Sequence, residues 1–260
     1  MTSLADHQSK DFVKLLLIGD SKSGKTGSLA SLVFAGYKLR ILDYDNGLDA
    51  LAQVIKQRDP KLLANVEYRT LRDKVIATPI GPMVPNPTAF IEGLKLLDKW
   101  EPFGVPATWG KEVIVVLDSF TFMSDAAFNY RLPIVPKSKD GKFDVRMVYK
   151  DAQDAAESVL ALLTSDNFLC NVVVISHVRY VVNPDGTKKG YPSAVGSALS
   201  PLIPRYFNSV ALAQTGPGGK RQIQTAPTAM IDLANPASFK MLSTLPIETG
   251  LGTFFETVRS

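Results

Sequence analysis

One short segment near the N-terminus has the spacing of a phosphate-binding loop. It matches the pattern G-x-x-x-x-G-K-[ST] and is followed by Gly27, and its residues are Gly19, Asp20, Ser21, Lys22, Ser23, Gly24, Lys25 and Thr26. The glycines let the backbone turn tightly and approach phosphate oxygens, so that successive N–H groups face the anion at a helix N-terminus. We expect Lys25 to contact the β- and γ-phosphates and the Thr26 hydroxyl to ligate Mg²⁺. Residues 19–27 therefore predict a binding site for ATP with Mg²⁺.

Carboxylates follow two apolar runs, where a metal site and a water-activating base would need them. The run 113–117 ends at Asp118, which we expect at the end of a strand neighbouring the loop, holding Mg²⁺ or its water shell. Capping of the following helix by Asp118 is compatible with that role. Asp43 and Asp45 follow the run 38–42, and Asp45 is the preferred base because it lies beyond the strand tip. An Asx-type turn is the alternative for this pair.

His177 follows the apolar run 172–176 and marks the end of a further strand. Beside a phosphate loop it can hydrogen-bond the γ-phosphate and report the nucleotide state to the loop behind it. A purely structural histidine is the alternative. The predicted catalytic residues are thus Lys25, Asp45, Asp118 and His177, and the predicted metal ligands are Thr26 and Asp118.

The elements that must position these residues follow an alternating pattern. Apolar runs typical of buried strands alternate with helical patterns, as in a mostly parallel sheet covered on both faces. The expected strands cover residues 13–18, 38–42, 66–71, 113–117 and 172–175, and the expected helices cover 25–34, 48–57, a segment starting at Pro87 with Asn86 as N-cap, and 147–164. Residues 78–87 are expected to form a loop and 183–190 a hairpin tip or mobile loop. Runs at 210–213 and 221–225 flank a glycine-rich turn and predict a C-terminal antiparallel extension.

Composition indicates an ordinary globular protein of 260 residues, 45% hydrophobic and 21% charged. We expect a polar N-terminal arm over 1–12 and one domain over 13–260. The N-terminus lacks the pattern of a signal peptide, and no apolar run reaches the roughly 18 residues that span a bilayer. The single cysteine, Cys170, cannot form an internal disulfide. These features favour a cytoplasmic protein without a membrane partner.

Positive charge is concentrated in one segment. Residues 131–150 hold six basic and two acidic residues, so this segment accounts for the whole-chain net charge of +4. A basic loop with an aromatic residue suits sequence-independent binding of a single nucleic-acid strand, whereas a solvated surface loop is the alternative. Candidate contacts in this loop and in the segment after His177 are Lys137, Lys139, Lys142, Phe143, Arg146, Arg179, Lys188 and Lys189.

The order of these motifs resembles the RecA family of recombinase ATPases. The phosphate loop, the segment 43–49 (Asp-Tyr-Asp-Asn-Gly-Leu-Asp), the run ending Asp118-Ser119 and the strand ending His177-Val178-Arg179 carry the resemblance over roughly residues 13–225. The short chain looks most like the minimal RecA-like ATPases of bacteriophages, which assist single-strand annealing and recombination. The resemblance implies a RecA-like core and DNA-stimulated ATP hydrolysis.

The same resemblance implies roles for particular residues. Asp45 matches the catalytic glutamate, with a side chain one methylene shorter, Asp118 matches the Mg²⁺-linked aspartate, and His177 replaces a glutamine sensor. Residues 137–150 and 183–196 correspond to the two DNA-binding loops. Lys220 and Arg221 are the candidate cations that a neighbouring subunit would insert into the site.

Implied partners are single-stranded DNA, further copies of the chain in a filament or ring with ATP at subunit interfaces, and a single-strand-binding protein. If the protein is encoded by a phage, its compartment would be the host cytoplasm. Two alternatives stay open: a hexameric helicase-like motor on the same core, and a nucleotide-gated loader or scaffold with weak hydrolysis.

Overall fold

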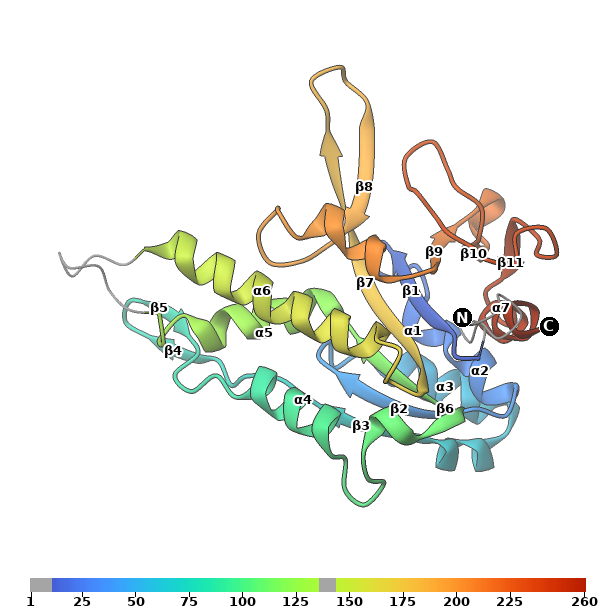
Figure 1. Ribbon diagram of the computed structural model, residues 1–260, viewed down its shortest axis with the longest axis horizontal. Coiled ribbons are helices and arrows are strands. Elements are labelled where there is room, and N and C mark those ends of the chain that lie inside the picture. The colour runs from blue at the N-terminus through green and yellow to red at the C-terminus, as the bar shows by residue number, and fades with distance from the viewer. Residues whose placement is uncertain (1–10, 136–143) are drawn as a thin grey trace, which may run out of the picture.

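The computed structural model describes residues 11–135 and 144–260, which form a twisted sheet with helices on both faces (Figure 1). Lys137, Lys139, Lys142 and Phe143 lie outside the described residues, as does most of the arm 1–12. In chain order the elements are β1 (Lys14–Gly19), α1 (Lys25–Ser28), α2 (Ala30–Phe34), β2 (Lys38–Asp43), α3 (Asp49–Arg58), β3 (Val66–Thr70), β4 (Ile76–Thr78), β5 (Gly81–Met83), α4 (Ala89–Asp98), β6 (Gly110–Asp118), α5 (Phe120–Arg131), α6 (Val145–Thr164), β7 (Cys170–Val182), β8 (Lys188–Pro192), β9 (Ser209–Thr215), β10 (Arg221–Gln224), β11 (Thr244–Pro246) and α7 (Gly250–Arg259). None of the helices in the described ranges is long and apolar enough to cross a bilayer.

The main sheet has the strand order β11-β10-β9-β1-β7-β6-β2-β3, with β8 paired to β7. The strands from β9 to β3 are parallel, whereas β10, β11 and β8 are antiparallel to their neighbours. Gly19 is paired with His177 and Asp43 with Asp118, each pair at the end of its parallel ladder. Because parallel strands end at one edge of the sheet, this edge gathers the predicted chemistry. The predicted α/β fold with a C-terminal antiparallel extension is confirmed.

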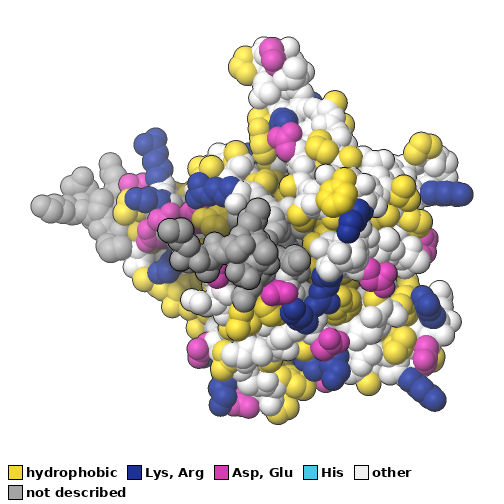
Figure 2. Space-filling view, turned by 45° about the vertical axis from the view of Figure 1, so that its right-hand side comes forward, with side chains coloured by type: hydrophobic (Ala, Val, Ile, Leu, Met, Phe, Trp, Pro, Cys, Tyr) yellow, Lys and Arg dark blue, Asp and Glu magenta, His cyan; other side chains and the backbone are white. Residues whose placement is uncertain are grey.

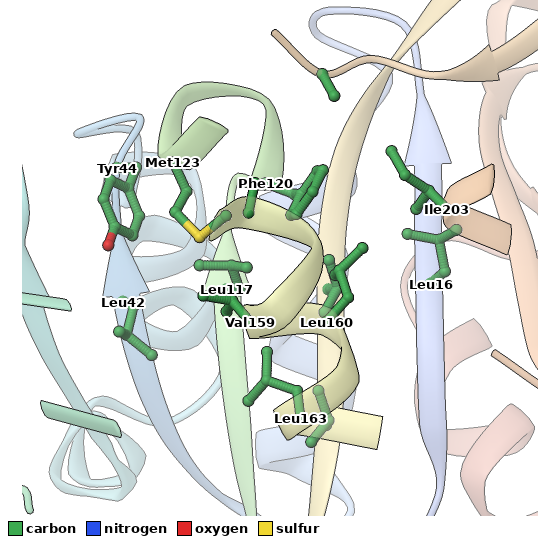
Figure 3. Packing of buried hydrophobic residues seen from close by; sticks show 14 of the residues in the cluster. Leu16, Leu42, Tyr44, Leu117, Phe120, Met123, Val159, Leu160, Leu163 and Ile203 are labelled. Carbon is green, nitrogen blue, oxygen red and sulfur yellow. The ribbon is translucent and has the colours of Figure 1, made fainter. Parts of the chain in front are cut away.

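Alternation along the strands divides the core into two layers. On β1, Leu16 and Ile18 pack on one face of the sheet, while Leu15 and Leu17 pack on the other. Residues of α4, α5 and α6 cover the first face, and residues of α2, α3 and α7 cover the second. Figure 3 shows the first layer, where side chains of β6, α5 and α6 meet, among them Leu117, Phe120, Met123, Val159 and Leu160.

The strand expected at 172–175 is much longer in the structure. β7 pairs with β1 as far as His177, and its second half leaves the parallel sheet and pairs with β8. The Asn183 N–H donates to the carbonyl of Thr187 at 2.8 Å, which closes the turn. Residues 183–187 are therefore the tip of a hairpin, and residues 188–190 belong to the strand β8. Figure 1 shows this hairpin projecting from the molecule.

Other elements also differ from the expectation. No residue range was predicted for α5, the helix that follows Asp118, and the helix expected at 25–34 is divided at Leu29. Residues 78–87 contain part of the β4–β5 hairpin. The helix α4 begins at Ala89, and the Asp73 carboxylate accepts from the N–H groups of Thr88 at 2.8 Å and Ala89 at 2.9 Å. A distant acid thus caps this helix in place of Asn86.

Candidate active site

The phosphate loop lies where β1 leaves the sheet. Gly19 ends β1, and a Cβ there would lie 2.4 Å from the carbonyl oxygen of Ala213 on β9. Gly24 has a φ of 97°, which favours glycine. After Gly24 the backbone is helical through α1 and α2, because Leu29 between them keeps helical angles. The sequence 19–27 thus forms a strand–loop–helix, as anion binding by backbone N–H groups requires.

Lys25 is held over the loop. Its Nζ donates to the carbonyl of Gly19 at 2.9 Å and to that of Asp20 at 2.8 Å. Burial lowers the pKa of Lys25, and the charges of Asp118, Asp45 and Asp20 act in the opposite direction. The third hydrogen of the ammonium group is left for a ligand, so this side chain can contact a phosphate in the same cavity.

Asp118 and Thr26 meet across the site. The Thr26 Oγ1 donates to Asp118 Oδ2 at 2.7 Å. Asp118 ends β6, which is separated from β1 by β7, so the metal-linked acid lies on the next strand but one and not on the neighbouring strand. Burial, together with Asp45 and Asp43, raises the pKa of Asp118 to about 7 against the opposing effects of Thr26 and Lys25.

The oxygen atoms of this pair fit a magnesium ion. Asp118 Oδ1 is buried and has no hydrogen-bond partner among the residues the structure describes. A hydroxyl and a carboxylate are the protein ligands that Mg²⁺ takes beside phosphate oxygens and water. Thr26 and Asp118 could therefore hold Mg²⁺, with Asp118 ionised.

The two acids after β2 have different surroundings. Asp43 is buried, and its Oδ1 accepts from the Asn46 N–H at 2.7 Å, so it fixes the turn that leaves the strand. Asp45 is partly exposed, lines the cavity over the phosphate loop and accepts from the Ser119 hydroxyl at 2.8 Å. The geometry therefore favours Asp45 over Asp43 as a group that could reach an attacking water.

His177 lies at the point where β7 leaves the parallel sheet, and not at the end of its strand as expected. The backbone N–H of His177 donates to Thr121 Oγ1 at 3.1 Å, and the imidazole ring packs edge-on against Phe122. Burial and the charge of Lys25 lower the pKa of His177, while Asp45 acts in the opposite direction. A neutral imidazole at this position can hydrogen-bond a phosphate.

One cavity of about 360 Å³ lies over the phosphate loop, a size typical of small-molecule sites. The buried Asp118 and Asp43 are not among its lining residues. Lys25, Thr26, Asp45 and His177 all contribute to its wall, and so does Arg221. Sequence analysis assigned Lys220 and Arg221 to a neighbouring subunit's site. In the structure Arg221 lies at the loop of its own chain, because β9 pairs with β1 and the following turn returns over Gly24. Lys220 does not line this cavity.

Four candidate DNA-binding residues lie in the described part of the chain, and none of them lines the cavity. Arg179 donates to the carbonyl of Gly196 at 2.7 Å, Lys188 lies over the Tyr180 ring, and Lys189 pairs with Asp232. Figure 2 shows the β7–β8 hairpin as a narrow protrusion with hydrophobic side chains and few charges. Arg146 lies in the first turn of α6. The structure brings Arg179, Lys188 and Lys189 onto one hairpin, but it does not bring Arg146 onto the same element.

Sequence reasoning missed several residues that shape the site. Ser119 holds Asp45, Thr121 holds the backbone of His177, and Phe122 packs against its ring. All three follow Asp118 directly. A signal was present, because the residues behind a strand-terminal acid must lie at the same edge of the sheet.

Comparison with known proteins identifies the family. No curated protein matches the chain. One similar solved structure is described as a prototypical ATPase from the type III secretion system of pathogenic bacteria, with 11% identity, a TM-score of 0.42 and coverage of 78% of this chain and 51% of that one. The chain thus spans about half the length of that protein. Residues 11–235, most of the chain, match the family described as AAA domain. The chain therefore belongs to the AAA domain family, and residues 19–26 are its phosphate loop.

Proposed function

We propose that this ATPase is a Mg²⁺-dependent, single-strand-DNA-binding enzyme of the RecA-like recombinase or annealing type. It would act in DNA recombination, repair or replication, in a phage context. The observation that carries the proposal is the course of β7. This strand runs without a break from the site residue His177 into the projecting hairpin that holds Arg179. A change at the phosphates can therefore reach the hairpin through one rigid element.

In this proposal each residue of the cavity has one task. Backbone N–H groups of residues 19–27 and Lys25 bind the phosphates of ATP, and Thr26 and Asp118 hold Mg²⁺. The metal ion neutralises phosphate charge when it is bound. Asp45 orients and deprotonates the attacking water, and Ser119 fixes the direction of its carboxylate. His177 hydrogen-bonds the γ-phosphate.

The hairpin is the proposed contact for a single DNA strand. Arg179, Lys188 and Lys189 supply positive charge, and the half-buried Tyr191 is the proposed stacking residue beside them. Stacking of this kind contributes about 1–3 kcal/mol per base without sequence preference. Arg146 and the segment 137–143 would add the second basic contact. The enzyme is proposed to assemble with further copies of itself, as a filament or ring, and to act beside a single-strand-binding protein.

A second candidate is a nucleotide-gated loader that hydrolyses ATP slowly. The contact between Asp45 and Ser119 favours it, because a short carboxylate already bonded to a hydroxyl is less free to take a proton from water. The two candidates differ in the effect of DNA on turnover. DNA accelerates turnover in the first and leaves it slow in the second.

The decisive measurement is steady-state ATP turnover with and without single-stranded DNA, over a salt series. The parent protein should hydrolyse ATP, DNA should stimulate it, and stimulation should fall steeply with salt because phosphate contacts release counterions. Lys25→Ala should lose turnover, and Lys61→Ala, an exposed change at the opposite edge of the sheet, should not. A single-stranded RNA of equal length tests the choice of nucleic acid. Absence of stimulation by DNA at low salt would refute the recombinase assignment.

A further inference from the structure

Arg221 is an exposed cation that lies at the phosphate loop. Within the described part of the chain, its guanidinium has no hydrogen bond and no salt bridge. Its aliphatic stem crosses the loop so closely that a Cβ on Gly24 would lie 3.0 Å from Arg221 Cδ. A guanidinium offers five donors in a fixed fork that matches phosphate oxygens. A free fork beside an anion-binding loop is arranged to meet the anion.

The sheet fixes this position within one chain. Arg221 is the first residue of β10 and lies opposite Thr215 of β9. The strand β9 is in turn the direct parallel neighbour of β1, which carries the phosphate loop. The Gly216 N–H donates to the carbonyl of Lys220 at 2.7 Å and closes the turn between them. Backbone pairing within one chain therefore places Arg221 at the phosphate loop, and no second chain is needed to place it.

Two cavities meet at this arginine. The first is the cavity over Lys25 and His177, and the second, of about 470 Å³, extends toward Val54, Ile247 and Glu248. Gly24, Gly27, Ala50 and Arg221 line both. If the phosphates of a nucleotide occupy the first cavity, its nucleoside part can extend past Arg221 into the second cavity.

The geometry points to Arg221 as a phosphate-binding residue for the nucleotide of its own chain, and not for that of a neighbouring subunit. This inference rests on the proposal that residues 19–27 bind a nucleoside triphosphate. It goes beyond that proposal because the cation acts in cis. ATP binding by a single chain then requires Arg221, whereas a cation inserted in trans would matter only after assembly.

The first test is the binding of a fluorescent ATP analogue with Mg²⁺ to the full chain, diluted until it is monomeric by mass photometry. Arg221→Ala should raise Kd about 10- to 100-fold, the effect of losing a hydrogen-bonded charge. Arg221→Lys should raise it less, because it keeps the charge but loses the fork. Lys61→Ala is the control and should leave Kd unchanged. Equal Kd for parent and Arg221→Ala would overturn the inference. A parent chain without affinity would instead remove the proposed function.

The second test mixes two defective chains at an ATP concentration well below the Kd of Arg221→Ala. Lys25→Ala retains Arg221 but lacks the lysine of the phosphate loop, and Arg221→Ala has the reverse defect. If the arginine acts in trans, mixed assemblies contain interfaces with one intact site and recover ATP turnover. If it acts in cis, every chain keeps a defective site, and mixing restores nothing. Recovery of turnover on mixing would overturn the inference whatever the binding data show.

Discussion

Replacing Asp118 with asparagine should change the free energy of unfolding of the nucleotide-free protein more favourably at pH 8 than at pH 5. The carboxylate is buried, close to Asp43 and Asp45, and its pKa is raised from 3.8 to about 7. The folded protein thus holds a proton up to about pH 7, which the unfolded chain releases near pH 4. The free energy of unfolding of the parent must fall as pH rises through this window, and it levels off above it. Asparagine cannot ionise, so the free energy of unfolding of the variant does not fall in this pH window.

The folded and unfolded pKa values of Asp118 set the size of this loss of stability. With a folded pKa of about 7 and an unfolded value of 3.8, the loss between pH 5 and pH 8 is about 2 to 3 kcal/mol, from 1.36 kcal/mol per pKa unit. Effects that do not depend on pH, such as weaker bonding of Thr26 to the amide, are equal at both pH values. They cancel when the difference between variant and parent at pH 5 is subtracted from that at pH 8.

The assay is urea unfolding of parent and Asp118→Asn at pH 5 and pH 8, with a chelator present. Asp98→Asn, which removes an exposed carboxylate, is the control for loss of charge. The subtracted difference should be about 2 to 3 kcal/mol in favour of Asp118→Asn. A value near zero would show that Asp118 does not hold a proton in the folded protein, and the physical account of this site would be wrong. The variant should be more stable at pH 8 and still lack ATP turnover.

Three further predictions follow from the contacts of single residues. Thr26→Val removes the hydroxyl bonded to Asp118, so ATP turnover should fall on the order of 100-fold with little change in Tm; normal turnover would contradict the role of Thr26. Gly24→Ala places a methyl group against Arg221 on a backbone in the left-handed region. The variant should lose about 1–2 kcal/mol of unfolding free energy in urea and should bind ATP more weakly. An unchanged Kd would show that the loop tolerates a side chain. Asn171→Ala removes a buried amide that bonds Val13 N–H at 2.9 Å and the carbonyl of Lys111 at 2.7 Å, and should cost about 2–4 kcal/mol without changing Kd for ATP in the folded fraction.

The sequence was sufficient to predict the parallel core because local signals and global placement agree there. Apolar runs ending at Gly19, Asp43 and Asp118 are strands that end at one edge of the sheet. The order of the strands could not be read in the same way. Placement of β7 between β1 and β6 depends on packing of distant elements, so the acid was expected one strand too close.

The elements that were missed have weaker patterns or distant partners. The helix α5 buries Phe120, Met123 and Ala127 but exposes Phe122, which blurs its amphipathic pattern. The cap of α4 comes from Asp73, and no spacing rule links that acid to Ala89. No secondary structure was predicted for residues 178–182, the second half of β7, although they are largely β-branched or aromatic.

The position of Arg221 shows what kind of question the sequence leaves open at such a site. A basic turn far along the chain can contact either the nucleotide of its own chain or that of a neighbouring subunit. The sequence of the turn is the same in both cases. The parallel pairing of β9 with β1 decides where the turn lies, because it brings the turn to Gly24 of the same chain. An arginine without a protein partner among the described residues, a lysine held by carbonyl groups and a carboxyl group with a raised pKa then have a common cause. Among the described residues none of the three groups forms a salt bridge, and phosphate and metal add charges of opposite sign. Nucleotide binding should therefore stabilise this protein more at pH 8, where Asp118 is ionised, than at pH 5.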